Sequence, residues 1–162
     1  MQALRHYLLA VQFFTRIPIT GRLADWVGYS PAMLRASAVH FPGVGWLVGA
    51  WVAGVLALLL ALLPPTDAAR WVAALFATAA GVWLTGAFHE DGLADTADAL
   101  GGAVGRDRAL EIMKDSRIGS YGAMALVLVV LLKCALLALL AARGTALVVA
   151  AVVATQVGTR YA

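Results

Sequence analysis

The amino-acid sequence predicts an all-α protein: a polytopic bundle of membrane helices with an acidic helical loop at one end. Three observations indicate this fold class: a strongly apolar composition, long uncharged segments, and acidic residues gathered in one stretch. Of the 162 residues, 62% are hydrophobic and 13% are charged, whereas about a quarter of the residues in a soluble domain are charged. The mean hydropathy of +0.86 is also typical of an integral membrane protein. The length predicts one membrane domain over residues 1–162.

Four apolar segments are candidates for membrane spans. We expect them near residues 41–63, 71–88, 123–142 and 145–162, because about 20 apolar residues cross the hydrocarbon core of a bilayer. Residues 1–40 carry four arginines and two prolines and are expected to form an interfacial N-terminal segment. Lys133 falls within the third span, so it either faces the bundle interior or marks a segment that lies shallower in the membrane.

Small residues in the first span are spaced for close helix packing. Gly45 with Gly49, and Ala50 with Gly54, form two pairs in which small residues stand four positions apart, a spacing that lets a neighbouring helix approach. Cys134, the single cysteine, lies in an apolar run and is expected to be a packing residue. A single cysteine excludes an internal disulfide and a cysteine-based zinc site within this sequence.

The distribution of lysine and arginine predicts the orientation. Four basic residues lie in residues 1–40 and four in residues 89–122, and two predicted spans separate these segments. The loops expected on the opposite side contain only Arg70 and Arg143. The positive-inside rule therefore places the N-terminus and residues 89–122 in the cytoplasm. The basic residues form no aromatic-interleaved patch, so the predicted partner is the lipid bilayer and not nucleic acid.

Residues 89–122 hold seven of the nine acidic residues. Asp91, Asp95 and Asp98 stand at positions i, i+4 and i+7, which fall within an arc of roughly 60° on a helix. Three carboxylates so close repel one another, and a divalent metal ion is the simplest partner. Carboxylate oxygens suit magnesium or manganese held jointly with substrate phosphates, so the pattern favours phosphoryl transfer. For Asp91 alone, a helix N-cap is the structural alternative.

The rest of this segment offers further candidates. A second helix is expected over residues 106–115, in which Asp107 and Glu111 are either functional or form surface pairs with neighbouring basic residues. The turn at residues 114–122 combines Lys114 and Arg117, suited to phosphate oxygens, with glycines that admit a ligand close to the backbone. The sequence leaves three interpretations of His89 open: a metal ligand, a general acid or base, or an interfacial histidine that is hydrogen-bonded to a loop.

Two long strings in this segment are similar to a known family. Residues 89–98 (HEDGLADTAD) and 106–119 (RDRALEIMKDSRIG) resemble the signature of cobalamin synthase, the adenosylcobinamide-GDP ribazoletransferase family. Residues 13–18 (FFTRIP) and 41–45 (FPGVG) resemble it as well. The resemblance therefore extends over essentially the whole chain.

The resemblance implies a polytopic enzyme of the bacterial inner membrane that uses magnesium. Its substrates would be adenosylcobinamide-GDP and alpha-ribazole, free or phosphorylated, and it would release GMP. In this picture Asp91, Asp95 and Asp98 are the metal ligands, Asp98 or His89 exchanges the proton, and the phosphate-binding residues are Lys114, Arg117 and Arg16. Family members continue beyond residue 162, so the resemblance predicts a C-terminally truncated chain. A homo-oligomer is compatible with it.

Two other functions fit parts of the pattern. A CDP-alcohol type phosphotransferase also presents spaced aspartates at a membrane surface. This alternative lacks support, because Asp95 and not an arginine follows Ala94. A non-enzymatic transport or scaffold protein would use the acidic face to conduct or store a cation. Ion pathways usually place their acids within the spans, and the predicted spans contain none.

Overall fold

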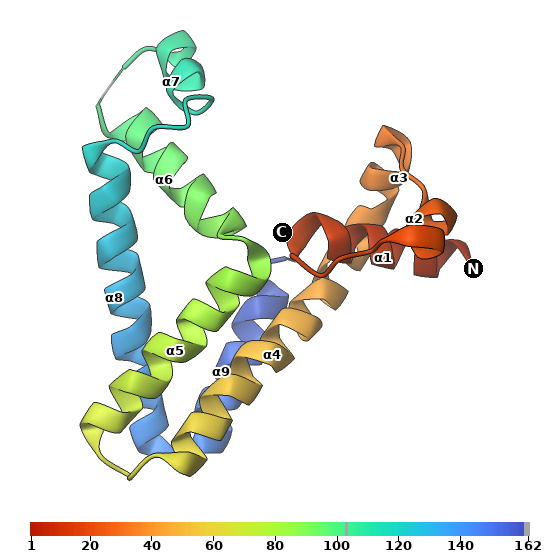
Figure 1. Cartoon of the computed structure of the whole chain (residues 1–162). Coiled ribbons are helices and arrows are strands. Elements are labelled where there is room, and N and C mark those ends of the chain that lie inside the picture. Colours follow the sequence, from red (N-terminus) through yellow and green to blue (C-terminus); the bar gives the residue numbers. More distant parts are fainter. Residues whose placement is uncertain (103, 161–162) are drawn as a thin grey trace.

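Every regular element in residues 1–102 and 104–160, the part of the chain that the computed structural model describes, is a helix (Figure 1). The N-terminal segment contains α1 (Gln2–Phe14), α2 (Gly21–Val27), α3 (Pro31–Ala36) and the 3-10 helix η1 (Ser37–His40). The other elements, in chain order, are α4 (Phe41–Leu62), α5 (Asp67–Thr85), α6 (Phe88–Gly101), α7 (Arg106–Ile112), α8 (Ser120–Arg143) and α9 (Thr145–Gly158). The predicted all-α fold class is confirmed.

Three segments of the structure are long and apolar enough to cross a membrane. The first segment, Pro31–Leu62, ends in α4, and the other two are α5 and α8. With 22 residues α4 is about 33 Å long, and with 24 residues α8 is about 36 Å long. Helix α9, within the fourth predicted span, has 14 residues and a length of about 21 Å, which is shorter than a bilayer core. Residues 161–162 of that predicted span lie outside the described residues.

The second span lies earlier in the sequence than the prediction of residues 71–88. Helix α5 begins at Asp67 because the Thr66 side chain accepts a hydrogen bond from the Ala69 amide at 3.2 Å and so caps the helix. Asp67 and Arg70 then pair on the first turn. The helix ends at Thr85 because the next two residues adopt left-handed backbone conformations. The predicted helix over residues 106–115 is also shorter, since α7 ends at Ile112.

The core lies where α4 packs between α5 and α9. Helix α4 contributes four large and fully buried side chains, those of Val44, Val48, Val52 and Leu56. Helix α5 contributes three fully buried alanines, Ala73, Ala74 and Ala77. Cys134 of α8 is fully buried beside Thr78, with 3.6 Å between the sulfur and the hydroxyl oxygen. The prediction that Cys134 is a packing residue is confirmed.

One of the two predicted small-residue pairs forms a helix contact. A Cβ placed on Gly45 would lie 2.7 Å from Val157 Cα, and one on Gly49 would lie 3.2 Å from Val153 Cα, both in α9. Around Gly54, apart from the adjoining residues and backbone of α4 itself, no atom of the described chain lies within 4 Å of such a Cβ. The first pair therefore brings α4 against the backbone of α9, whereas the second pair faces outward.

This difference between the two pairs predicts the result of a matched pair of substitutions. Gly45→Ala should destabilise the protein by about 1–3 kcal/mol, because the added methyl group overpacks the contact with α9. Gly54→Ala makes the same chemical change in open space and should not lower the stability. Thermal unfolding of the detergent-solubilised variants measures the difference. Equal melting temperatures would show that α4 and α9 do not pack through Gly45.

The N-terminal segment and the acidic segment lie at the same end of the bundle. The Phe13 and Phe88 rings are 5.5 Å apart, and the Arg16 amide donates to the Leu84 carbonyl at 2.7 Å. The turns that join α4 to α5 and α8 to α9 lie at the other end (Figure 1). Lys133 of α8 is partly buried and lines a cavity that faces α9. This agrees with the first of its two predicted positions, the bundle interior.

Candidate active site

A bend between α5 and α6 directs the acidic helix away from the bundle core. Gly86 (φ 67°) and Ala87 (φ 63°) are both left-handed, which for alanine costs about 1–2 kcal/mol. The Ala87 amide donates to the Val82 carbonyl at 2.9 Å, and Arg16 bonds to Leu84 just before the bend. As Figure 1 shows, α5 and α6 meet at this bend and α8 runs past both helices. The acidic residues of α6 are thus held against the first half of α8.

Helix α6 packs on α8 through very small side chains. Ala94 and Ala99 are buried on its inner face, as is Gly122 of α8. The ring of Tyr121 covers Gly101 so closely that a Cβ there would lie 2.5 Å from the ring. Close packing of this kind leaves little freedom for the two helices to slide. The carboxylates of α6 therefore have a defined position relative to the start of α8.

Asp91 and Asp95 stand one turn apart on α6. Asp91 is exposed and Asp95 is half-buried. Within residues 1–102 and 104–160, no hydrogen bond or ion pair reaches either carboxylate. Their side chains thus keep their full capacity to accept a ligand. The N-cap alternative for Asp91 does not apply, because α6 begins at Phe88, after Ala87.

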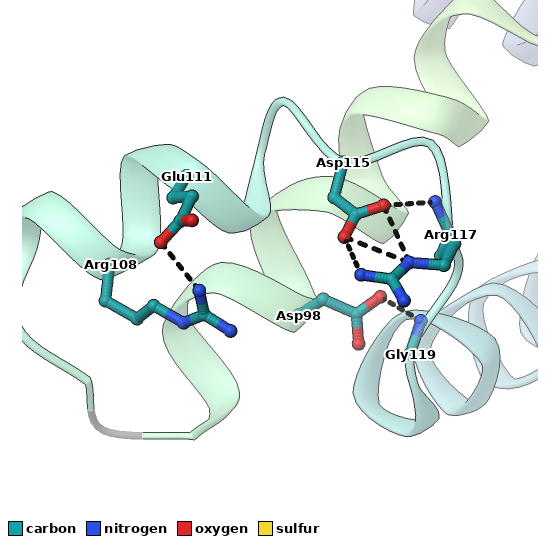
Figure 2. A network of polar contacts seen from close by, with 6 residues as sticks. All are labelled: Asp98, Arg108, Glu111, Asp115, Arg117 and Gly119. Carbon is teal, nitrogen blue, oxygen red and sulfur yellow. Dashed lines mark hydrogen bonds and ion pairs between the residues drawn. The ribbon is translucent and has the colours of Figure 1, made fainter.

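Asp98, in contrast, already binds protein groups. Its two carboxylate oxygens accept hydrogen bonds from the backbone amides of Gly119 and Gly122, each at 2.8 Å. These amides belong to the N-terminus of α8, where backbone N–H groups lack helical partners and the helix dipole attracts negative charge. Figure 2 shows Asp98 reaching from α6 to Gly119. Asp98 therefore caps α8 from a neighbouring helix.

His89 lies away from the aspartates. It precedes Asp91 by two residues and so projects about 160° around the helix from it. Its ring stacks on Phe14 with centroids 6.2 Å apart. The pKa of His89 lies below its ordinary value, first because partial burial disfavours the imidazolium and then because Arg160 is nearby. His89 is thus a neutral imidazole that can accept a proton, on a different face from Asp91 and Asp95.

The predicted phosphate-binding residues belong to other segments and lie near opposite ends of α6. Arg16 lies at the bend, beside Gly86, and lines an apolar cavity of about 460 Å³ with Trp83 and Cys134. Lys114 and Arg117 lie beyond α7, near the opposite end of a helix that is about 21 Å long. One phosphate group cannot contact both sets, so the structure separates Arg16 from the other two.

Ion pairs already shape the turn that carries Lys114 and Arg117. The Arg117 guanidinium donates to both Asp115 oxygens, at 2.6 to 3.1 Å (Figure 2). This hydrogen bonding lowers the pKa of the Asp115 carboxyl to about 2. On α7, Arg108 pairs with Glu111 at 2.6 Å, so the surface-pair alternative predicted for Glu111 is confirmed. Lys114 is exposed and remains the more available cation of the turn.

These positions fit a magnesium site made by two carboxylates. Among the described residues, no group of three or more His, Cys, Asp and Glu side chains lies close enough to hold a metal ion. Magnesium, however, is usually held by one or two carboxylates together with water and substrate phosphates. Asp91 and Asp95 are a donor set of that kind. The predicted third ligand, Asp98, is not close enough to form such a three-residue group in the described structure, and it instead accepts hydrogen bonds from the amides of α8.

The chain is similar to known proteins over most of its length. The family model described as cobalamin-5-phosphate synthase matches residues 6–162. The chain belongs to this family. The match covers both acidic strings and the N-terminal motifs, so the family predicted from the motifs is confirmed. No solved structure matches the chain.

Curated relatives of the cobalamin-5-phosphate synthase family agree with this assignment. A protein of Polaromonas naphthalenivorans named adenosylcobinamide-GDP ribazoletransferase is 71% identical over 140 residues, which are 86% of this chain and 50% of the relative. Proteins of the same name from Albidiferax ferrireducens and Ralstonia nicotianae are 64% and 46% identical, each over 98% of this chain. The chain spans about half the length of these curated relatives.

The site also contains residues that sequence reasoning left out. Glu90 follows His89, and the family motif gave no reason to include it, yet it lines a polar cavity with His89 and Lys133. Arg160 reaches the same cavity from the end of α9. Lys133 carried a sequence signal, since a lysine within a span is rarely without a function. Arg160 carried the same kind of signal, because it falls within the predicted span of residues 145–162, but nothing in the sequence linked it to Glu90, 70 residues earlier.

Proposed function

We propose that the chain takes part in the transfer of the adenosylcobinamide phosphate group from adenosylcobinamide-GDP to alpha-ribazole or its phosphate, with release of GMP. The observation that carries this proposal is the pair of unengaged carboxylates, Asp91 and Asp95, on the helix that holds the family motif. The names of the relatives support the choice of substrates. The positive-inside rule supports a cytoplasmic site at an inner membrane.

In the proposed reaction, the ribazole hydroxyl oxygen forms a bond to the phosphorus that is linked to cobinamide. The bond between that phosphorus and the bridging oxygen of the diphosphate breaks, and GMP leaves with the bridging oxygen. Asp91 and Asp95 would hold magnesium, which when bound supplies positive charge to the diphosphate and the leaving GMP. The chain's own residues have the tasks of orienting the phosphates and receiving the hydroxyl proton.

The structure supports different tasks for the remaining candidates. Lys114 lies on the exposed turn near the end of α6, where its ammonium group can contact a phosphate, and Arg117 can do so only in competition with Asp115. His89 is the candidate proton acceptor, but it lies on a different face of α6 from Asp91 and Asp95, so it would receive the hydroxyl proton through an intervening water. Asp98 would position the start of α8 and with it the turn at residues 114–119. This assigns Asp98 an indirect part in the reaction.

The test is to measure GMP by mass spectrometry. Membranes containing the chain receive adenosylcobinamide-GDP, alpha-ribazole and magnesium, and the Polaromonas naphthalenivorans relative serves as the positive control. We expect GMP and a corrin product in equal amounts, loss of both on chelation with EDTA, and recovery with magnesium. No GMP from the chain, under conditions in which the relative releases it, would refute the proposal. Release of CMP from a CDP-alcohol would instead indicate the other phosphotransferase class.

A further inference from the structure

A polar cavity of about 170 Å³ lies beneath the bend, where the start of α6 meets α8 and the end of α9. Four ionisable side chains line it: His89, Glu90, Lys133 and Arg160. The cavity is separate from the pair of aspartates, because His89 projects from the opposite side of α6. The proposed metal site therefore does not explain why four ionisable side chains meet in this cavity.

The side chains in this cavity are incompletely paired. Arg160 is only 7% exposed, and its Nη1 donates to the main-chain and side-chain oxygens of Gln156 at 2.8 and 2.7 Å. Its Nε, however, is buried without a partner, and so is Oε2 of Glu90. Within the described chain these are the two buried side-chain atoms that lack a hydrogen bond, and both belong to this one cavity. Burial of unpaired polar atoms is unfavourable unless water or a ligand pairs them.

The charges in the cavity are unbalanced as well. Lys133 and Arg160 bring two positive charges to the cavity, and Glu90 brings one negative charge. No ion pair within 4.0 Å joins Glu90 to a cation among the described residues. Water can satisfy hydrogen bonds, but it carries no charge to balance the excess positive charge in the cavity. The cavity therefore favours an anion.

The unpaired atoms specify which anion fits. Arg160 Nε and the Lys133 ammonium group need acceptors, whereas Glu90 Oε2 needs a donor. A phosphate group that keeps one proton offers both, because its P–O oxygens accept and its P–O–H donates. Sulfate at neutral pH offers acceptors only and would meet the Glu90 carboxylate with an unprotonated oxygen. The volume holds on the order of ten waters, which suits a phosphate group but not a nucleotide or a corrin ring.

We propose that the cavity lined by Glu90, Lys133 and Arg160 is a binding site for a protonated phosphate group, and that Glu90 makes it discriminate against sulfate. The group is inorganic phosphate or the phosphate monoester of a larger molecule whose remainder stays outside the cavity. Phosphatidic acid in the bilayer and a soluble phosphate monoester share this chemistry. The proposal does not depend on the transfer reaction or on magnesium.

The test uses the full chain in nanodiscs of phosphatidylcholine, with inorganic phosphate as the probe in isothermal titration calorimetry at pH 7. We expect saturable binding that weakens by about tenfold or more in Arg160→Gln and in Lys133→Met. Arg143→Gln is the matched control, because it removes an exposed arginine at the other end of α8 and should leave the binding unchanged. In nanodiscs that contain phosphatidic acid, competition with added phosphate identifies the lipid as a source of the group.

Glu90→Gln keeps the proposal testable even when the other variants do not fold. The neutral amide removes a negative charge and can donate to an anion, so this variant should bind sulfate about as well as phosphate, whereas the unmodified chain prefers phosphate by about tenfold or more. Two results would overturn the proposal. One is the absence of saturable binding of both inorganic phosphate and phosphatidic acid, and the other is an unchanged preference for phosphate in Glu90→Gln.

Discussion

Replacing Asp91 by asparagine is expected to reduce GMP release by a factor on the order of a thousand, the loss typical for the removal of one electrostatic group from a reaction centre. The reason is that Asp91 and Asp95 are the two aspartates of α6 whose carboxylates take part in no hydrogen bond or ion pair within the described residues, and the proposed magnesium site depends on both. Asp91 is exposed, so the change should leave the fold intact, as surface substitutions usually do. The mass-spectrometric assay for GMP measures the effect.

Binding of the metal alone gives a second readout for Asp91→Asn, independent of turnover. Electron paramagnetic resonance of added manganese should show about tenfold weaker binding in this variant. Glu111→Gln is the control, because Glu111 is an exposed carboxylate on α7 that pairs with Arg108. If Asp91→Asn binds manganese and releases GMP like the unmodified chain, Asp91 is not a metal ligand.

Replacing Asp98 by alanine is expected to destabilise the protein by about 2 kcal/mol, since two hydrogen bonds from amides to a carboxylate are lost at the start of α8. The amides of Gly119 and Gly122 should then exchange with deuterium much faster, because the first turn of α8 loses its cap. Hydrogen exchange measured by mass spectrometry on peptides that cover residues 117–123 reports this directly. Thermal unfolding gives the global effect.

Asp98→Asn separates the capping task from the catalytic tasks that the sequence suggested. Asparagine has one acceptor oxygen where aspartate has two, so this variant should keep the hydrogen bond from one of the two amides, Gly119 or Gly122, lose the other, and retain part of the GMP release. If Asp98 were a metal ligand or a general base, asparagine at this position would reduce GMP release as much as alanine does. If Asp98→Asn is as inactive as Asp98→Ala while one of the two amides stays protected, Asp98 takes part in the chemistry itself.

The membrane helices were largely predictable because their signal is local. A run of apolar residues long enough for a bilayer indicates a span wherever the helix finally packs, and α4 and α8 begin and end within a few residues of the predicted positions. The start of α5 was missed because Asp67 and Arg70 read as loop residues, whereas they pair with each other on the first turn. Its end was missed because Ala87, an unlikely residue for a left-handed conformation, has no sequence signal.

The candidate site was predictable only in part, for a related reason. Helical spacing correctly placed Asp91 and Asp95 one turn apart, because both lie on one continuous helix. The same spacing grouped Asp98 with them and had no information on Gly119 and Gly122, which lie 21 and 24 residues further along the chain. Likewise, helical spacing separates His89 from Asp91, but only the packing of α8 and α9 brings Lys133 and Arg160 to the same cavity.

By itself, the sequence determined that this chain is a helical membrane protein of the cobalamin-5-phosphate synthase family with an acidic helix at one end. Composition, helical periodicity and motif order carry that information, and all three are properties of neighbouring residues. Only the tertiary structure decided that Asp98 caps α8, that Arg16 and Lys114 lie at opposite ends of α6, and that Glu90 and Arg160 share a cavity. The physical reason is that hydrogen bonds and charges act through space, between groups that the fold brings together from distant parts of the chain.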